Sequence, residues 1–268
     1  MTPIKAKFLA AVSSASLLVA CTVAITPEWE RYYSHASAGE TRMDWVGEIA
    51  VDSYGDILVA GETSRISGEH EQNLLLVKFN PQGQRLWVLE HDTTEGLMRS
   101  DERVHALVVD SQGNSYVAGT QYLATENASA YGSFLTKVSA SGQVIWSRQI
   151  SEHDNTFTLV LAQDKLYVTG LATQVFDLDG VQVLNIAHPA HPAWAIAVDA
   201  AGDMLVAGQS GVARFAADGS LRWRTAVPAG ANQQASLAIG VDGSVVLGQG
   251  TDDAGAIRVS RLSAFGAL

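Results

Sequence analysis

The chain has 268 residues and a formal net charge of −11, and charged residues make up only 17 % of it. An acidic surface repels phosphate backbones and anionic lipid head groups, which argues against nucleic-acid binding. The 24 glycines, together with abundant Val, Leu and Ala, predict an all-β chain rich in turns.

Residues 1–20 have the pattern of an export signal. "MTPIKAKF" carries two lysines and no acid, and it precedes the apolar run "LAAVSSASLLVA", which is too short to cross a bilayer as a mature helix. The run ends in Leu18-Val19-Ala20-Cys21, which resembles the lipobox of bacterial lipoproteins. The resemblance implies lipid transfer to the Cys21 sulfur, cleavage between Ala20 and Cys21, and acylation of the new amino terminus. The alternatives are a cleaved signal with an incidental cysteine, or a buried core thiol.

A lipidated Cys21 has consequences for location and chemistry. Two or more acyl chains, such as palmitate, anchor a protein stably to a bilayer. In such lipoproteins a residue other than Asp after the cysteine, here Thr22, implies the outer membrane, on its periplasmic face or at the cell surface. Cys21 is the only cysteine, so no thiol remains for disulfides or metal. We expect a signal peptide at 1–20, a lipidated tether at 21–28 and one domain at 29–268.

An internal repeat organises the remaining sequence. "IAVDSYGDILVAGET" (49–63) recurs as "LVVDSQGNSYVAGTQ" and "IAVDAAGDMLVAGQS", and degenerate copies follow the same spacing. The clear copies lie at 49–63, 107–121 and 196–210, and the degenerate copies at 159–173 and 237–251. A second motif, such as "LVKFNPQGQRLW", follows at 76–87, 135–146 and 212–223, with a degenerate copy at 174–184. Each motif predicts a β-hairpin, because two β-rich runs flank a turn of Asp, Ser, Asn and Gly. Two hairpins give a four-stranded antiparallel unit.

Glycine and tryptophan recur at fixed places in these units. A glycine is expected to end the second strand and to allow close backbone approach. These glycines are Gly61, Gly119, Gly170, Gly208 and Gly248. A tryptophan follows the second turn glycine by four residues in three units, at Trp87, Trp146 and Trp223. We expect each to lie on the outer strand and to pack between neighbouring units.

A single small sheet cannot bury both of its faces, whereas about five arranged radially can. The sequence therefore predicts a β-propeller with about five four-stranded blades. Trp29 precedes Gly61 by 32 residues, as Trp87 precedes Gly119, so "PEWERYY" is expected to form a strand that completes the last blade and closes the ring. If one degenerate repeat is misread, the predicted number of blades changes by one. The chain could instead be half of a larger ring formed by pairing.

The repeat also resembles a known family. "VVDSQGNSYVAGT" resembles the bacterial SBBP-type β-propeller repeat, which runs Asp-x-x-Gly-Asn-x-Tyr-Val-x-Gly, and it is similar to NHL and quinoprotein-like repeats. The resemblance covers most of residues 45–268. It implies the architecture but no activity, because propellers have unrelated functions. The quinoprotein-like relatives include outer-membrane assembly lipoproteins, which implies a scaffold role by analogy.

No catalytic constellation, metal site or cofactor is recognisable. His188 and His191 could share a metal, but a closed site needs about four ligands, so a solvated loop is favoured. The acidic turns "DSYGD" and "DAAGD" lack the length and the final glutamate of a calcium loop, which favours plain turn chemistry. Candidate carboxylates are expected in or near turns; they are Asp101, Glu102, Asp177 and Asp179.

Three inserts lengthen the first two units, at 62–73, 90–103 and 120–132. Loops on a rigid scaffold often carry binding, so these inserts form a binding rim if they share one face. The alternative is that the inserts reflect sequence drift among the repeats and carry no binding function.

We expect a monomeric, non-enzymatic, lipid-anchored propeller that serves as a binding or scaffold module for a protein or glycan partner in the cell envelope. The alternative is a polysaccharide-acting hydrolase or lyase with its site in the central channel. That alternative requires two acids from different blades to face each other.

Overall fold

The computed structural model describes residues 28–33, 42–65, 72–93, 99–124, 129–151, 158–188, 193–208, 211–227, 235–250 and 256–267. The chain divides into two parts, Met1–Arg31 and Tyr32–Leu268. The described residues of the first part have no regular secondary structure, and the Arg31 guanidinium lies 5.8 Å from the centroid of the Trp29 ring. The predictions for Ala20 and Cys21 lie outside the described residues. Within these ranges no helix is long and apolar enough to cross a membrane.

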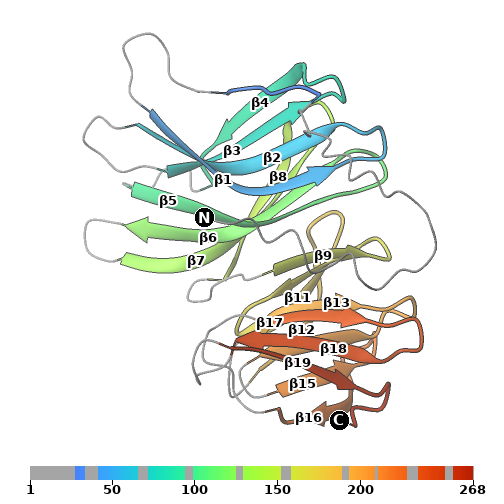
Figure 1. Ribbon diagram of the computed structural model, residues 1–268. Helices are drawn as coiled ribbons and strands as arrows, with labels where there is room; N and C mark the ends of the chain where they lie inside the picture. The colour runs from blue at the N-terminus through green and yellow to red at the C-terminus, as the bar shows by residue number, and fades with distance from the viewer. Residues whose placement is uncertain are drawn as a thin grey trace, which may run out of the picture. The chain divides into compact units, whose positions relative to one another are not determined.

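The strands fall into five groups along the chain, which we call repeats 1 to 5 (Figure 1). Repeat 1 contains β1 (Arg42–Val51), β2 (Ile57–Arg65), β3 (Gln72–Phe79) and β4 (Arg85–His91). Repeat 2 contains β5 (Arg99–Val109), β6 (Ser115–Ala124), β7 (Ser129–Val138) and β8 (Val144–Ser151). Repeat 3 contains β9 (Thr158–Ala162), β10 (Lys165–Thr169), β11 (Ala172–Asp177) and β12 (Gln182–Ala187). Repeat 4 contains β13 (Ala193–Val198), β14 (Met204–Gly208), β15 (Gly211–Phe215) and β16 (Leu221–Thr225). Repeat 5 contains β17 (Ala235–Ile239), β18 (Val245–Gly250) and β19 (Ile257–Leu262).

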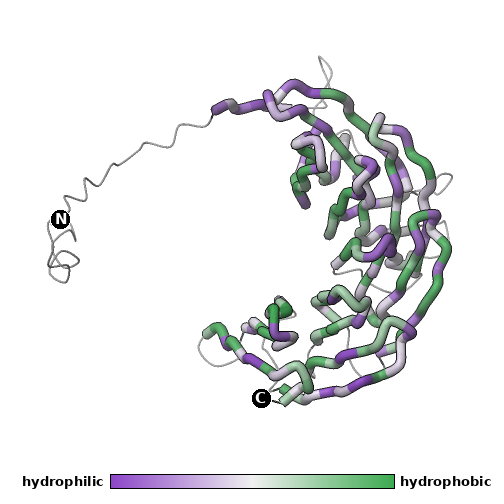
Figure 2. Tube along the Cα trace, turned by 90° about the vertical axis from the view of Figure 1, so that its right-hand side faces the viewer, coloured by the Kyte–Doolittle hydropathy of each residue, from purple (hydrophilic) through white to green (hydrophobic). Residues whose placement is uncertain are grey.

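Within each repeat the strands pair antiparallel in chain order, as the hairpin motifs predict. Among the described strands, one parallel pair, Gln72 with Asp101, joins β3 to β5. The described secondary structure is all-β, as predicted, and hydrophobic stretches recur along its strands (Figure 2).

The predicted turn chemistry is confirmed at the hairpins. The Oδ1 atom of Asp52 accepts hydrogen bonds from the backbone N–H groups of Tyr54 and Asp56, both at 2.9 Å, and Gly55 adopts a φ of 80°. A carboxylate that satisfies two amides, followed by a residue with positive φ, fixes a tight hairpin. The same arrangement recurs at the turns that begin with Asp110, Asp177 and Asp199.

Hydrophobic clusters form between consecutive repeats. One cluster joins Leu58 and Leu76 of repeat 1 to Val104 and Phe134 of repeat 2. Three further clusters join repeats 2 and 3, 3 and 4, and 4 and 5. The first strands of consecutive repeats also contact one another, in the order β1, β5, β9, β13 and β17. Repeats 2, 3 and 4 therefore each pack between their two chain neighbours.

The predicted tryptophan positions between repeats are confirmed. Trp87 Nε1 donates to the Ala140 carbonyl at 2.9 Å, and a Cβ placed on Gly142 would lie 2.7 Å from the Trp87 ring. Trp146 and Trp223 bond in the same way to the second-hairpin turn of the following repeat, at Leu178 and Ala264. The indole and the turn glycine thus form one contact, repeated along the chain.

The predicted role of the strand-ending glycines is only partly confirmed. A Cβ on Gly61 would lie 1.8 Å from the Trp45 carbonyl oxygen, and one on Gly119 would lie 2.1 Å from that of Arg103, because bulges in β1 and β5 press the backbones together. Gly248 faces no bulge, and a Cβ there would meet nothing within 4 Å, so the prediction is wrong for Gly248. The strands β2 and β6 also continue past their glycines to Arg65 and Ala124.

Ring closure stays a prediction. Residues 28–33 show no strand, and β19 is an edge of a three-stranded sheet among the described strands. Within the described part of the chain, no contact comparable to those between consecutive repeats joins β1–β4 to β17–β19.

Candidate functional site

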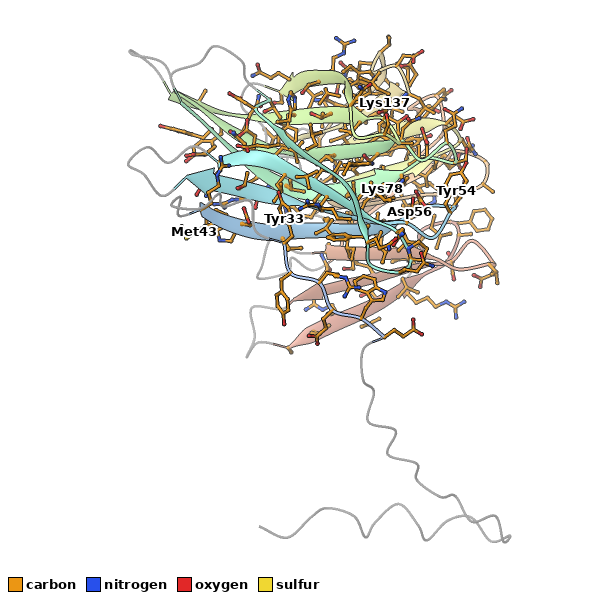
Figure 3. The ribbon with its side chains drawn as sticks, turned by 90° about the horizontal axis from the view of Figure 1, so that it is seen from above. Tyr33, Met43, Tyr54, Asp56, Lys78 and Lys137 are labelled. Carbon is orange, nitrogen blue, oxygen red and sulfur yellow. The ribbon has the colours of Figure 1, made fainter. Side chains whose placement is uncertain are left out.

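The three inserts of the first two repeats share one end of their strands. Most of the residues predicted as loop are strand extensions instead. Ser64 pairs with Gln72, and Tyr122 pairs with Tyr131. The Gln72–Asp101 pair brings the two repeats together at this end. We call this region the extended end; it comprises 62–65, 72–74, 90–93, 99–104, 119–124 and 129–133. Figure 3 shows Met43 on this side of repeat 1 and Tyr54 at the opposite, turn end.

Glu102 is a fully buried carboxyl group within the extended end. Its Oε1 atom accepts hydrogen bonds from the Thr93 backbone N–H at 3.0 Å and from the Thr93 hydroxyl at 2.8 Å. Burial raises the pKa of Glu102 to about 7, the bonds from Thr93 oppose this rise, and the charge of Asp92 adds to it. Its Oε2 atom is buried and has no hydrogen-bond partner.

Gln121 pairs with Glu102 across β5 and β6 and is also buried. Its Oε1 atom lies 2.8 Å from the same Thr93 hydroxyl, and its Nε2 atom has no hydrogen-bond partner. One hydroxyl has one hydrogen and cannot donate to two acceptors at once. Two changes resolve this conflict: a protonated Glu102, whose carboxyl group becomes a donor, or a rotated Gln121 amide, whose Nε2 group then donates to the hydroxyl. The arrangement therefore fits a neutral acid at the pKa given above.

Glu62 is a second buried acid, and it lies in repeat 1. Its Oε1 atom accepts from the backbone N–H of Val104 in repeat 2, and burial raises its pKa. Glu62 of repeat 1 and Glu102 of repeat 2 thus lie at the same contact between repeats, but different groups donate hydrogen bonds to them. The acid that raises the pKa of Glu102 is Asp92, not Glu62. A general acid must reach its substrate, and a fully buried Glu102 does not. The pair therefore gives no support to the hydrolase or lyase alternative.

The solvent side of the extended end carries aromatic groups. The rings of Tyr122 and Tyr131 lie 5.1 Å apart between centroids with a tilt of 54°, and Tyr131 is exposed. Met43 and Trp45 on β1 are also exposed and pair with Ser64 and Glu62 at this end. Large amphipathic side chains of this kind contribute strongly to binding surfaces.

The described histidines show no metal site. His188 Nε2 lies 2.8 Å from the Thr173 hydroxyl, and burial, followed by the charge of Arg224, lowers its pKa. His191 lies outside the described residues. His105, which no sequence motif singles out, makes the same kind of contact with the Thr120 hydroxyl at 3.0 Å. In the part of the chain that the structure describes, no three His, Cys, Asp or Glu residues gather as a metal site.

The predicted positions of the candidate carboxylates are partly confirmed. Asp177 and Asp179 lie in or beside a turn, as predicted. Asp101 and Glu102 lie in β5 instead, so the turn prediction is wrong for them. The reason is the extension of β5, which pairs with β6 up to Arg99 and Ala124.

A buried ion pair in repeat 1 was not recognised from the sequence. Lys78 Nζ lies 2.8 Å from Asp52 Oδ2 and 3.2 Å from Asp56 Oδ2, and Figure 3 shows Lys78 beside Asp56. Arg214 takes the same place in repeat 4, against Asp199 and Asp203.

Repeat 3 provides an internal comparison for this ion pair. In repeat 3, Val175 takes the position that Lys78 has in repeat 1, which we call the cation position. Val175 stands two residues before the turn residue Asp177, as Lys78 stands two residues before the turn residue Asn80. The preceding turn of repeat 3 is built on Gln163 and Asp164, both with positive φ, and lacks the turn aspartate. Repeat 3 thus lacks both the cation and the first-hairpin aspartate. In repeat 2, Lys137 stands at the cation position but donates to the Leu178 carbonyl, so the buried ion pair belongs to repeats 1 and 4.

Comparison with known proteins identifies the fold. No family model matches the chain, and no curated protein matches it. A Bacteroides caccae protein of unknown function has a TM-score of 0.51 at 14 % identity, over 84 % of this chain and 80 % of that chain. The WD40 repeats of RRP9 also have a TM-score of 0.51, at 15 % identity, over 79 % of this chain and 63 % of that chain. A gluconolactonase from Xanthomonas campestris has a TM-score of 0.44 at 14 % identity, over 75 % and 68 %. WD40 repeats are four-stranded propeller blades, so the chain is a propeller-like repeat protein.

Proposed function

We propose that the protein is a lipid-anchored binding or scaffold module of the cell envelope, which uses its extended end to hold a protein or glycan partner. The observation that carries this proposal is the gathering of three strand extensions at one end, with the Tyr122–Tyr131 pair on their surface. The inserts predicted to form a rim lie at this shared end.

The packing beneath this surface supports a preformed site. Glu62 ties repeat 1 to the backbone of repeat 2, and Thr93 links Glu102 to Gln121. Such non-local bonds hold the strand extensions in place before a partner arrives. A partner then loses less free energy to the ordering of the protein.

Photo-crosslinking in the bacterial envelope tests the binding surface. A benzophenone side chain replaces Tyr131 in the full chain, and the matched control replaces Tyr54, which is equally exposed at the opposite end. We expect adducts with a protein or glycan from position 131 and none from position 54. Equal labelling at both positions, or none at 131, would contradict the proposal.

The anchor is tested separately. Cys21 at the lipobox-like position motivates it, and we expect Cys21→Ser to move the protein from the membrane fraction to the soluble fraction. A variant that stays fully membrane-bound would contradict the anchor, but it would not contradict the proposed binding surface.

A further inference from the structure

The first and last repeats each expose an apolar sheet face. The first-repeat face consists of Val46, Ile49 and Val51 on β1, which are 75 %, 63 % and 63 % exposed. The last-repeat face consists of Ile257 and Val259 on β19, which are 81 % and 70 % exposed. Contiguous exposed aliphatic surface of this kind marks an interaction site in a soluble domain.

The interior repeats show what covers the first-repeat face. In repeat 2, Val104 opposes Gly119 as Val46 opposes Gly61 in repeat 1. Leu107 stands at the position of Ile49 by the same register. Val104 and Leu107 are only 5 % and 8 % exposed, because they pack against repeat 1 in a shared cluster.

The same comparison identifies what covers the last-repeat face. Leu76 precedes the end of β3 by three residues, as Val259 precedes the end of β19, and Leu74 corresponds to Ile257. Leu74 and Leu76 are fully buried against repeat 2. The two exposed faces are therefore the two halves of the contact that consecutive repeats make throughout the chain.

We propose that the first-repeat face of one chain packs on the last-repeat face of a second copy, so that two copies form a head-to-tail dimer through two equal contacts. The proposal concerns assembly and does not rest on the proposed function. It replaces the expectation of a monomer.

Two observations favour a second copy over closure within one chain. Both faces are exposed in the same chain, and no comparable contact joins β1–β4 to β17–β19 among the described strands. The WD40 repeats of RRP9 also match 79 % of this chain with only 63 % of their own length, so part of that chain lies outside the match. A second copy supplies further repeats with the required face. Head-to-tail contacts of this type close into a ring when the rotation permits.

Disulfide trapping tests the proposal and separates it from closure within the chain. Val46→Cys and Val259→Cys are each made in the full chain carrying Cys21→Ser, purified in mild detergent. Their counterparts Val104 and Leu76 belong to one cluster, so the two cysteines are expected to approach each other. We expect a mixture of the two single variants to give a disulfide-linked dimer under mild oxidation. We expect the double variant to give linked dimers rather than an internal bond.

The control and the contrary outcomes are specific. In the control, Val241→Cys takes the place of Val259→Cys, because Val241 is fully exposed in the turn of repeat 5 but lies outside the last-repeat face. We expect Val241→Cys to give no disulfide-linked dimer with Val46→Cys. An internal disulfide at the mass of one chain would show that the ring closes within the chain. Absence of any disulfide in the mixture would also overturn the proposal.

Discussion

Glu102 shows how a single residue couples this fold to pH. The carboxyl group is buried in β5, and its unbonded Oε2 atom leaves it better accommodated as a neutral acid. Gln121 and Thr93 surround it with polar groups that do not remove this preference.

The stability of the protein is expected to fall as the pH rises through the range of Glu102. The pKa is about 7 in the folded chain against an ordinary value of 4.5, so the folded state binds more protons than the unfolded state between these values. The contribution amounts to about 3 kcal/mol below pH 4.5, and it is lost as the pH rises to about 7. Glu102→Gln keeps the shape and stays neutral. We expect it to raise the urea midpoint at pH 8 and to change it little at pH 4.5.

Glu48→Gln is the control for this measurement, because Glu48 is exposed on β1. We expect its urea midpoint to follow the wild type at both values of pH. A Glu102→Gln variant with the wild-type pH dependence would contradict the buried neutral acid.

Lys78 is the second residue whose burial has a measurable consequence. Its ammonium group neutralises Asp52, whose side chain is completely buried. Burial raises the pKa of Asp52, but the hydrogen bonds from Lys78 and from the turn amides outweigh this, and the pKa lies below its ordinary value. Lys78→Met leaves that charge without its cation, and we expect a loss of about 3 kcal/mol in the free energy of unfolding.

Arg261 offers a matched control for Lys78 from another repeat. It pairs with Asp242 at 2.7 Å on the surface. Both partners are solvated, so we expect Arg261→Met to leave the urea midpoint almost unchanged. Equal losses in the two variants would show that burial does not determine the effect.

At the scale of the element, the hairpin turn and the preceding tryptophan form one packing unit. Gly142 adopts a φ of 84°, and any Cβ there would overlap the Trp87 ring from the previous repeat. The turn is therefore both a local structure and a contact between repeats.

Gly142→Ala is expected to be more destabilising than the same change at Gly243. Both glycines have positive φ, which costs about 1 kcal/mol for alanine. The nearest atom to a Cβ on Gly243 is 3.3 Å away, whereas at Gly142 the indole lies at 2.7 Å. We expect an additional loss of about 2 kcal/mol at Gly142 from overpacking, measured by urea unfolding. Equal losses would mean that Trp87 does not pack on the turn.

At the scale of the whole molecule, the features that recur in each repeat were predictable, and packing outside the repeat pattern was not. The Asp-x-x-Gly turns follow from residues close in sequence, and the tryptophan contacts between repeats follow from the recurrence of Trp and Gly in the repeat. The burial of Glu102 depends on Thr93 and Gln121, which approach only after β5 and β6 extend together. Strand bulges likewise decide which glycines are essential, and Gly248 has none opposite it.

The central claim is that the first and last repeats of two copies pack face on face. The mass of the assembled protein tests this claim most directly. Sedimentation equilibrium of the full chain in mild detergent is compared with Val259→Glu, which places a charge in the last-repeat face, and with Val241→Glu outside it. We predict twice the mass of one mature chain for the wild type and for Val241→Glu, and the mass of one mature chain for Val259→Glu. A wild-type protein that sediments as one chain would contradict the account.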